Sequence, residues 1–185
     1  MLATDILSSE HRVIERVIAS MEIAASGLEG GKVVRPGFFL DAADFIKGFA
    51  DGCHHRKEEG VLFVRMADNG MPVEGGPVGV MLREHEMGRA YTRNMREVAQ
   101  KLDAGDGTAK AKVVENARGY AQLLKQHIFK EDHILFPMAS QVIPFEQQIQ
   151  VAEDFEHVEH EETGEGVHEK YLALAEKLEQ EAGAI

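Results

Sequence analysis

The segments HHRKEEGVLF, at residues 54–63, and HIFKEDHILF, at residues 127–136, decide how the rest of this sequence is interpreted. Both follow one pattern, H-x-x-K-E-acid-x-aliphatic-L-F, so the chain contains an internal pseudo-repeat. In each copy a glutamate follows the histidine by four residues, which gives the pairs His54 with Glu58 and His127 with Glu131. Residues four apart lie on one face of a helix, so both side chains of a pair can reach the same centre. The repeat therefore predicts two equivalent ligand pairs on two helices.

Apolar residues recur at helical spacing on both sides of these segments and predict an all-α protein. Four long helices are expected, at about residues 4–27, 36–67, 77–102 and 108–138, separated by glycine-rich breaks. Pro137 is expected to kink or end the fourth helix. Connections of short to moderate length favour an antiparallel up-down-up-down four-helix bundle.

A fifth helical stretch is expected to begin at Pro144, to break near residues 164–166 and to resume to about Glu181. It is strongly acidic and has only a thin line of apolar residues. We therefore expect two domains, a four-helix bundle over residues 1–140 and an acidic C-terminal helical extension over residues 141–185 that packs on the bundle. The apolar face of this extension permits a homodimer without requiring one.

The composition excludes several classes of protein. The formal net charge of -12 repels nucleic-acid phosphates and anionic lipids, so neither is an expected partner. The single cysteine, Cys53, cannot form an internal disulfide, and the N-terminus lacks the pattern of a signal peptide. No run approaches the roughly 20 apolar residues of a membrane span, so we expect a cytoplasmic protein.

Four of the nine histidines fall on the predicted inward faces of the four helices, one on each; they are His11, His54, His85 and His127. With a rise of ~1.5 Å per residue, those on the first and third helices lie near the helix starts, and the other two lie toward the helix ends. These ends meet in an antiparallel bundle. A buried polar ring is costly unless it finds partners, so four rings at one depth predict a shared site rather than four separate core histidines.

Four histidines and two glutamates at one depth are a donor set for metal ions. If both carboxylates bridge two metals, each metal receives two nitrogens and two oxygens, and an oxo or hydroxo bridge leaves an octahedral ion with one open position. This set suits iron better than structural zinc, which prefers four closed ligands, often with cysteine. Zinc and manganese remain alternatives, as does an ordinary bundle with interior polar residues.

These residues resemble the hemerythrin-like, or HHE cation-binding, domains over roughly residues 5–140. Besides the two repeat segments, the resemblance is carried by SSEHRVIERV around His11 and GGPVGVMLREHEMGR around His85. The tail FEHVEHEETGEGVHEKY is similar to the C-terminal extension of bacterial members. The resemblance implies a four-helix bundle, the fold of myohemerythrin, and two iron ions in an oxo- or hydroxo-bridged centre. The implied iron ligands are His11, His54, Glu58, His85, His127 and Glu131.

The third helix departs from the oxygen-carrying members of that family, which have two histidines one turn apart there. In this chain Met81 and Arg89 stand four residues from His85 on either side. His55 can supply the missing nitrogen, although it lies ~100° around an α-helix from His54. This departure puts reversible oxygen carriage in doubt.

Which carboxylate of the fourth helix is the ligand also has two possible answers. The oxygen carriers end with His-x4-Asp, a spacing that fits His127 and Asp132, whereas the match between the two repeat segments favours Glu131. In the tail, His168 is a further candidate ligand.

Other residues have competing interpretations. Tyr120 lies two turns before His127 on the same face, where core packing is favoured over a hydrogen bond to a bound ligand. Glu84 and Arg89 flank His85, either to orient it or as an ordinary surface pair.

The resemblance implies a non-haem di-iron protein that binds dioxygen or nitric oxide for sensing, storage or scavenging, rather than an enzyme. Iron donation to damaged iron–sulfur clusters and a small di-iron oxidase or peroxidase are the alternatives. The sequence contains no recognisable substrate pocket, phosphate-binding loop or Ser-His-Asp arrangement.

Overall fold

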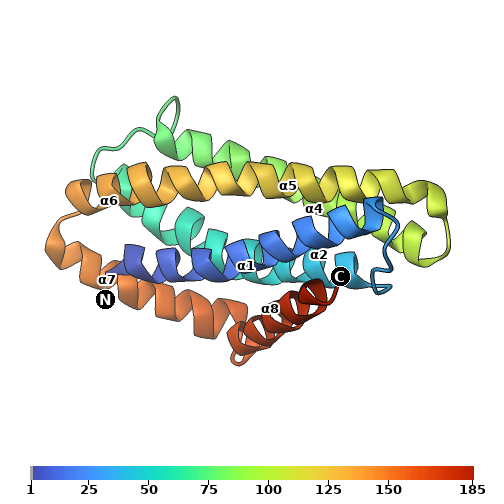
Figure 1. The fold of residues 1–185 in the computed structure, drawn as a ribbon. Helices are drawn as coiled ribbons and strands as arrows, with labels where there is room; N and C mark the ends of the chain where they lie inside the picture. The colour runs from blue at the N-terminus through green and yellow to red at the C-terminus, as the bar shows by residue number, and fades with distance from the viewer. Residues whose placement is uncertain (1) are drawn as a thin grey trace.

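A computed structural model of the chain describes residues 2–185, except for the side chain of Glu162. These residues form helices and connecting loops without a strand, so the prediction of an all-α protein is confirmed (Figure 1). In chain order the elements are α1 (Ala3–Glu29), α2 (Phe38–Phe45), η1 (Ile46–His55), η2 (Glu58–Leu62), α3 (Phe63–Asp68), α4 (Pro77–Asp103), η3 (Gly107–Ala109), α5 (Lys110–Lys130), η4 (Glu131–Leu135), α6 (Phe136–Val142), α7 (Phe145–His157), η5 (Val158–Thr163) and α8 (Val167–Gly183).

Glycine ends the long helical runs where the sequence pattern predicts breaks. Gly70 and Gly105 follow α3 and α4 with φ of 94° and 95°, in the left-handed region that glycine enters without a steric penalty. The chain can therefore reverse direction within a few residues at both places.

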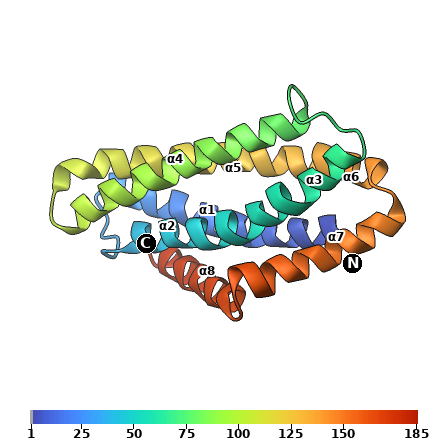
Figure 2. The same ribbon diagram turned by 180° about the vertical axis from the view of Figure 1, so that it is seen from behind.

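Two of the long runs pass through π-helical segments, in which the hydrogen bonds span one residue more than in an α-helix. The second run continues from α2 through η1 and η2 to α3, as Figure 2 shows from behind. The fourth continues from α5 through η4 to α6. Three of the predicted ligands, His54, Glu58 and Glu131, lie within these π segments.

The fourth run does not end near Met138, and this part of the prediction is wrong. Pro137 lies in the first turn of α6, directly after η4, where a residue without an N–H is tolerated. The helix ends instead at Val142, because Ile143 precedes Pro144 and adopts the extended conformation that a following proline favours, with ψ of 120°.

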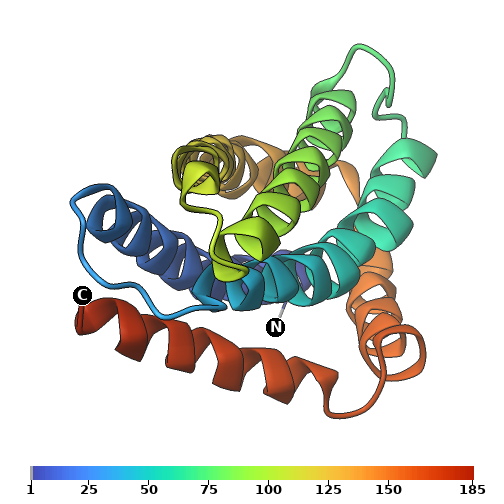
Figure 3. The same ribbon diagram turned by 90° about the vertical axis from the view of Figure 1, so that its right-hand side faces the viewer.

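The long runs pack around a common interior. Helix α4 lies along α5, α5 lies along α1, and α2 and η1 pack against α4 (Figure 3). Two clusters of buried apolar side chains fill this interior, one around Phe49 and Tyr120 and the other around Leu62 and Phe136. Along α1, the buried polar residues Glu10 and His11 fall between members of the two clusters.

The last three elements lie against the outside of these runs. Helix α7 contacts α1 and η2, and α8 contacts α1 and α2 (Figure 1). Tyr171 of α8 lies so close to η1 that a Cβ atom on Gly48 would be 2.0 Å from its hydroxyl. Val151 and Phe155 of α7 join the apolar cluster around Leu62. The division into two domains at residue 140 stays a prediction.

Candidate metal centre

Buried polar side chains gather between the two apolar clusters. They come from all four long runs and, apart from Ser20 and Thr92, are Glu10 and His11 of α1, His54 and His55 of η1, Lys57 and Glu58 of the second run, His85 of α4, His127 of α5 and Glu131 of η4. The six ligands expected from the sequence are all in this group. His11, Glu58 and Glu131 are 0% exposed, so water does not reach their side chains.

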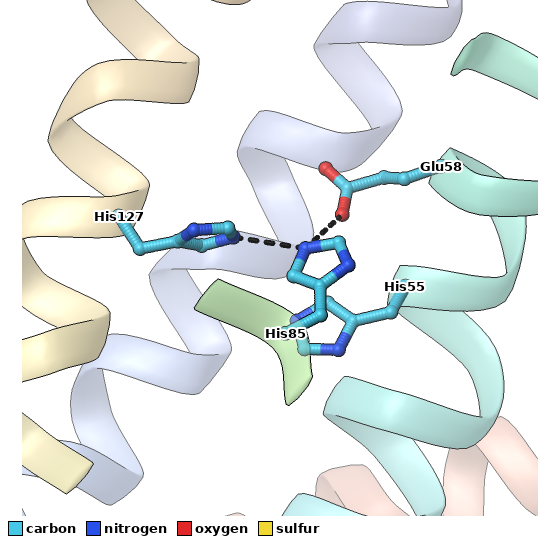
Figure 4. A group of neighbouring side chains, drawn as sticks. All are labelled: His55, Glu58, His85 and His127. Atoms are coloured by element: carbon cyan, nitrogen blue, oxygen red, sulfur yellow. Dashed lines mark hydrogen bonds and ion pairs between the residues drawn. The ribbon is translucent and has the colours of Figure 1, made fainter. Parts of the chain in front are cut away.

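The donor atoms of these residues form two sets that share one carboxylate, and within each set they lie within 4.8 Å of one another. The first set is His11, His54, Glu58 and Glu131. The second set is His55, Glu58, His85 and His127, drawn in Figure 4.

Glu58 directs one oxygen toward each set. Its Oε1 lies 3.5 Å from Nε2 of His54, and its Oε2 lies 3.4 Å from Nε2 of His85. Glu131 repeats this arrangement from the opposite run. Its Oε2 lies 3.2 Å from Nε2 of His11, and its Oε1 lies 3.1 Å from Nε2 of His127. Both carboxylates are thus oriented as groups that bridge two neighbouring ions would be.

The outward nitrogen of each of the four inward histidines meets a carboxylate. The Nδ1 contacts are His11 with Asp132 at 2.8 Å, His54 with Glu10 at 2.9 Å, His85 with Glu59 at 2.6 Å and His127 with Glu84 at 2.9 Å. A carboxylate accepts the Nδ1–H proton, which leaves the Nε2 lone pair of a neutral imidazole facing the interior. This is how metal-binding histidines are held in one tautomer and one orientation.

Each of these carboxylates is held in turn by a cation. The pairs are Arg12 with Asp132, Lys57 with Glu10, Arg89 with Glu59 and Lys130 with Glu84. Lys57 and Lys130 are the lysines of the H-x-x-K-E pattern, so the pseudo-repeat extends to this outer layer. The sequence interpretation missed Glu10, Glu59 and both lysines, although the shared lysine was a visible signal.

Two expectations about flanking residues are revised by this layer. Glu84 contacts His127 rather than its neighbour His85, and Arg89 holds Glu59, which contacts His85. A residue next to a histidine in sequence points about 100° away from it on a helix, so the partner comes from the facing run. Asp132 contacts His11, Ser8 and Arg12 and belongs to neither donor set.

His55 joins the second donor set. Its ring stacks on that of His85 with the centroids 3.8 Å apart and an interplanar angle of 14°. Because η1 is a π-helix with more residues per turn, consecutive side chains diverge by less than the ~100° of an α-helix. His54 and His55 can therefore both face the interior, which α-helical spacing had made improbable.

A third cluster of possible donors already surrounds a cation, the side chain of Lys57. Its members are Glu10, Cys53, Glu159 and His168. The ammonium group of Lys57 lies 2.6 Å from both Glu10 and Glu159. His168 lies in this cluster, with its Nδ1 3.5 Å from Glu159, and in neither of the two interior donor sets.

Buried atoms without a hydrogen-bond partner test whether the interior suits a metal. They include both oxygens of Glu58, both oxygens of Glu131, Nε2 of His11 and both ring nitrogens of His55. A fully buried carboxylate oxygen without a donor costs several kcal/mol, because its hydration is lost and nothing replaces it. Cations coordinated by these oxygens and nitrogens would remove that cost, so the residues fit a metal centre.

The protonation of the metal-free site follows from the same contacts. Burial opposes the charged form of His11, yet the Asp132 and Glu131 carboxylates beside its two ring nitrogens raise its pKa to about 9. Burial likewise opposes the charged form of His127, but the nearby Glu131 carboxylate raises its pKa to about 10. Burial and the adjacent His85 lower the pKa of His55 well below its usual value. Metal binding here would therefore release protons from His11 and His127, since only neutral imidazoles coordinate.

The comparisons with known proteins agree with this geometry. The family model described as the hemerythrin HHE cation binding domain matches residues 2–139. Similar relatives include uncharacterized proteins of Mycobacterium bovis and Mycobacterium tuberculosis, each 22% identical over 181 residues that cover 98% of this chain and 70% of the relative. No solved structure gives a significant match. Among the described residues, no helix is both long and apolar enough to cross a bilayer.

Proposed function

Since this chain belongs to the hemerythrin HHE cation-binding domain family, as its resemblance suggested, we propose that it is a non-haem di-iron protein that binds dioxygen or nitric oxide. The proposed frame is an antiparallel up-down-up-down bundle over residues 1–140, with the extension of residues 141–185 packed on it. In this proposal the protein binds a gas for sensing, storage or scavenging and acts in the cytoplasm, alone or as a homodimer.

The proposed ligands are the six from the sequence, with His55 added. His11 and His54 would hold the first ion, His85, His127 and His55 would hold the second, and Glu58 and Glu131 would contact both. The orientation of the two carboxylates carries this assignment, because each directs one oxygen to each donor set. Seven buried donors without thiolates favour iron over structural zinc, and Cys53 lies in neither interior set.

The side chains around the proposed ions fix the orientation of the ligands, limit the access of water and set the number of ligands. The carboxylates on Nδ1 hold four imidazoles in place, and the two apolar clusters exclude water from both ends. The first ion would have four protein ligands, fewer than the six of an octahedral ion, so an open position remains. Iron with an open position would supply a place where a diatomic gas can bind.

Metal analysis tests the proposal directly. Purified protein should contain about two irons per chain by mass spectrometry and show a near-ultraviolet charge-transfer absorption, as expected for a mixed nitrogen and oxygen iron site. His127→Ala should lose that iron, whereas His133→Ala, an exposed histidine six residues further on, should retain it. Zinc or no metal after anaerobic reconstitution with iron would refute the di-iron assignment.

Gas binding needs a separate measurement. Reduced, iron-loaded protein should change its absorption spectrum when dioxygen or nitric oxide is admitted, and His133→Ala should respond like the original chain. Iron-loaded protein with no spectral response to either gas would leave the metal site standing and refute the gas-binding function.

A small di-iron oxidase or peroxidase is the second candidate, and one observation favours it. A cavity of about 250 Å³ reaches His55, a member of the second donor set. Steady turnover of peroxide by the iron-loaded protein, lost in His127→Ala and kept in His133→Ala, would support this function. Iron-loaded protein without turnover would dismiss it.

A further inference from the structure

The cavity that reaches His55 opens between η1, α4 and α5. Its lining on the η1 side comes entirely from the π-helical segment, from Ile46 to His55. Buried residues form its deep part, and the basic residues at its rim are either exposed, as Lys47 and Arg93 are, or half-buried, as Arg89 and Arg96 are. Nothing in the proposed gas-binding function requires a cavity of this size.

The deep end of the cavity has polar atoms without partners. The Tyr120 side chain is 1% exposed, yet its hydroxyl makes no hydrogen bond within the part of the chain that is described. Both ring nitrogens of His55 also make no hydrogen bond, although a carboxylate oxygen of Asp51 lies 3.6 Å from its Nδ1. A buried hydroxyl without a partner is unfavourable, so these atoms indicate a ligand with a polar group at this end.

The middle of the cavity is apolar. Ile46 forms one wall, and the hydroxyl of Thr92 on the other side already donates to the carbonyl of Gly88. A Cβ on Gly88 would lie 3.6 Å from the Tyr120 ring, an ordinary contact, so close packing does not require glycine there. Its missing side chain leaves open space beside Tyr120.

The rim carries positive charge that the surrounding residues do not neutralise. Arg89 and Arg96 are held in ion pairs, and the carboxylate of Asp51 at the rim is bound by Arg89 at 2.7 Å. Lys47 and Arg93 also line the cavity and form no ion pair among the described residues. In a protein with a net charge of -12, two free cations at the mouth of an apolar cavity favour an anionic ligand.

We propose that this cavity binds a small organic anion with one carboxylate, an apolar body and a polar group at its far end. The carboxylate meets Arg93 and Lys47, the body lies between Ile46 and Gly88, and the far end reaches Tyr120. An apolar cavity of about 150 Å³ holds a benzene ring, so about 250 Å³ accommodates one ring with a substituent. Binding itself does not depend on metal; that the anion lies beside the second ion, as a substrate would, rests on the proposed function.

Calorimetric titration of the purified chain tests this inference, with sodium benzoate as the reference ligand and sodium 4-hydroxybenzoate, whose added hydroxyl can pair with Tyr120, expected to bind more tightly. Benzoate should bind saturably, whereas benzyl alcohol, which lacks the charge, and acetate, which lacks the ring, should bind more weakly. Arg93→Gln should weaken benzoate binding about fivefold, the upper range for an exposed ion pair. The matched control is Arg83→Gln, an exposed arginine ten residues earlier on α4, which should bind benzoate like the original chain.

A second variant tests the cavity itself. Gly88→Ala places a methyl group against Tyr120 and should reduce benzoate affinity, while the melting temperature stays the same or rises because alanine favours a helix interior. Equal binding of benzoate and benzyl alcohol, equal affinities of Arg93→Gln and Arg83→Gln, or absence of benzoate binding would overturn the inference. The inference would also be overturned if the affinity for benzoate changed with the iron content of each preparation and not with Arg93→Gln, since benzoate would then be a metal ligand. Preparations that bind benzoate but take up no iron on anaerobic reconstitution would instead leave the cavity standing and refute the di-iron function alone.

Discussion

Replacing Glu10 with glutamine should weaken both the fold and the metal site. Glu10 is buried, accepts a hydrogen bond from Nδ1 of His54 at 2.9 Å and pairs with Lys57 at 2.6 Å. The side chain of Lys57 is 0% exposed, and its other carboxylate partner is Glu159 of the tail. Burial opposes the ionised form of Glu10, but His54 and Lys57 lower its pKa to about 2. The substitution therefore removes a full negative charge from between His54 and Lys57.

The size of the effect follows from the burial of Lys57. Removing one partner of a buried ion pair costs about 3–5 kcal/mol, because the remaining charge stays desolvated. Glu159 still faces Lys57, so the lower value of about 3 kcal/mol applies. For a chain of this length, that corresponds to a melting temperature about 6–12 °C lower. Loss of the carboxylate on His54 should also lower metal affinity by about 10- to 100-fold.

Circular dichroism melting and competition with a chelator measure the two effects. The control is Glu179→Gln, which breaks the exposed pair with Arg16 and should change the melting temperature by little. A double variant with Glu10→Gln and Lys57→Met removes the buried cation that Glu159 alone would then face, so it should recover part of the stability without recovering metal affinity. If Glu10→Gln had the same melting temperature as Glu179→Gln and bound metal with unchanged affinity, the contacts that link Glu159, Lys57 and Glu10 to His54 would not stabilise the fold or the metal site.

Three further predictions address the ligands and the tail. Glu131→Gln should abolish iron binding, whereas Asp132→Asn should retain iron with about 10-fold lower affinity, because Asp132 only orients a histidine; equal iron loss in both variants would contradict the choice of Glu131. His55→Ala should lower the iron content by mass spectrometry without removing all of it, and an unchanged content would exclude His55 as a ligand. Burial would raise the pKa of Asp41, but Lys177 of α8 and Arg35 lower it below its usual value. The contact therefore adds to the free energy of unfolding above the unfolded carboxyl pKa of about 3.9, and this contribution is lost as the pH falls through the lower folded pKa. Asp41→Asn should therefore lower the melting temperature slightly at pH 7 and by less at pH 2, and an equal difference at both values would refute the assignment.

The family assignment and the helical character were available from the sequence because both depend on local patterns. Helical spacing of apolar residues is set by the 3.6-residue turn, and glycines with positive φ stop the helices at Gly70 and Gly105. The same spacing located an inward histidine on each of the four long runs. The repeated H-x-x-K-E segments then marked where two glutamates would enter the interior.

Deviations from the α-helix were not visible in the sequence. The π-helical turns of η1 bring His55 to the same side as His54, and η4 leads into Pro137 without ending the helix. Extra residues in a turn are stabilised by what the helix packs against and leave no clear local signal. The expected end of the fourth helix was wrong for this reason.

The sequence by itself determined that this chain is helical and that four histidines and two glutamates face its interior, because helical periodicity is a property of each segment alone. Only the tertiary structure decided which carboxylate holds each histidine, since Glu84 reaches His127 from the facing helix and not the adjacent His85. It also decided that Lys57 is fully buried between Glu10 of α1 and Glu159 of the tail, while Lys130, its counterpart in the repeat, is 31% exposed. Such pairings depend on how separate helices approach one another, and that relation is set by the packing of the whole core.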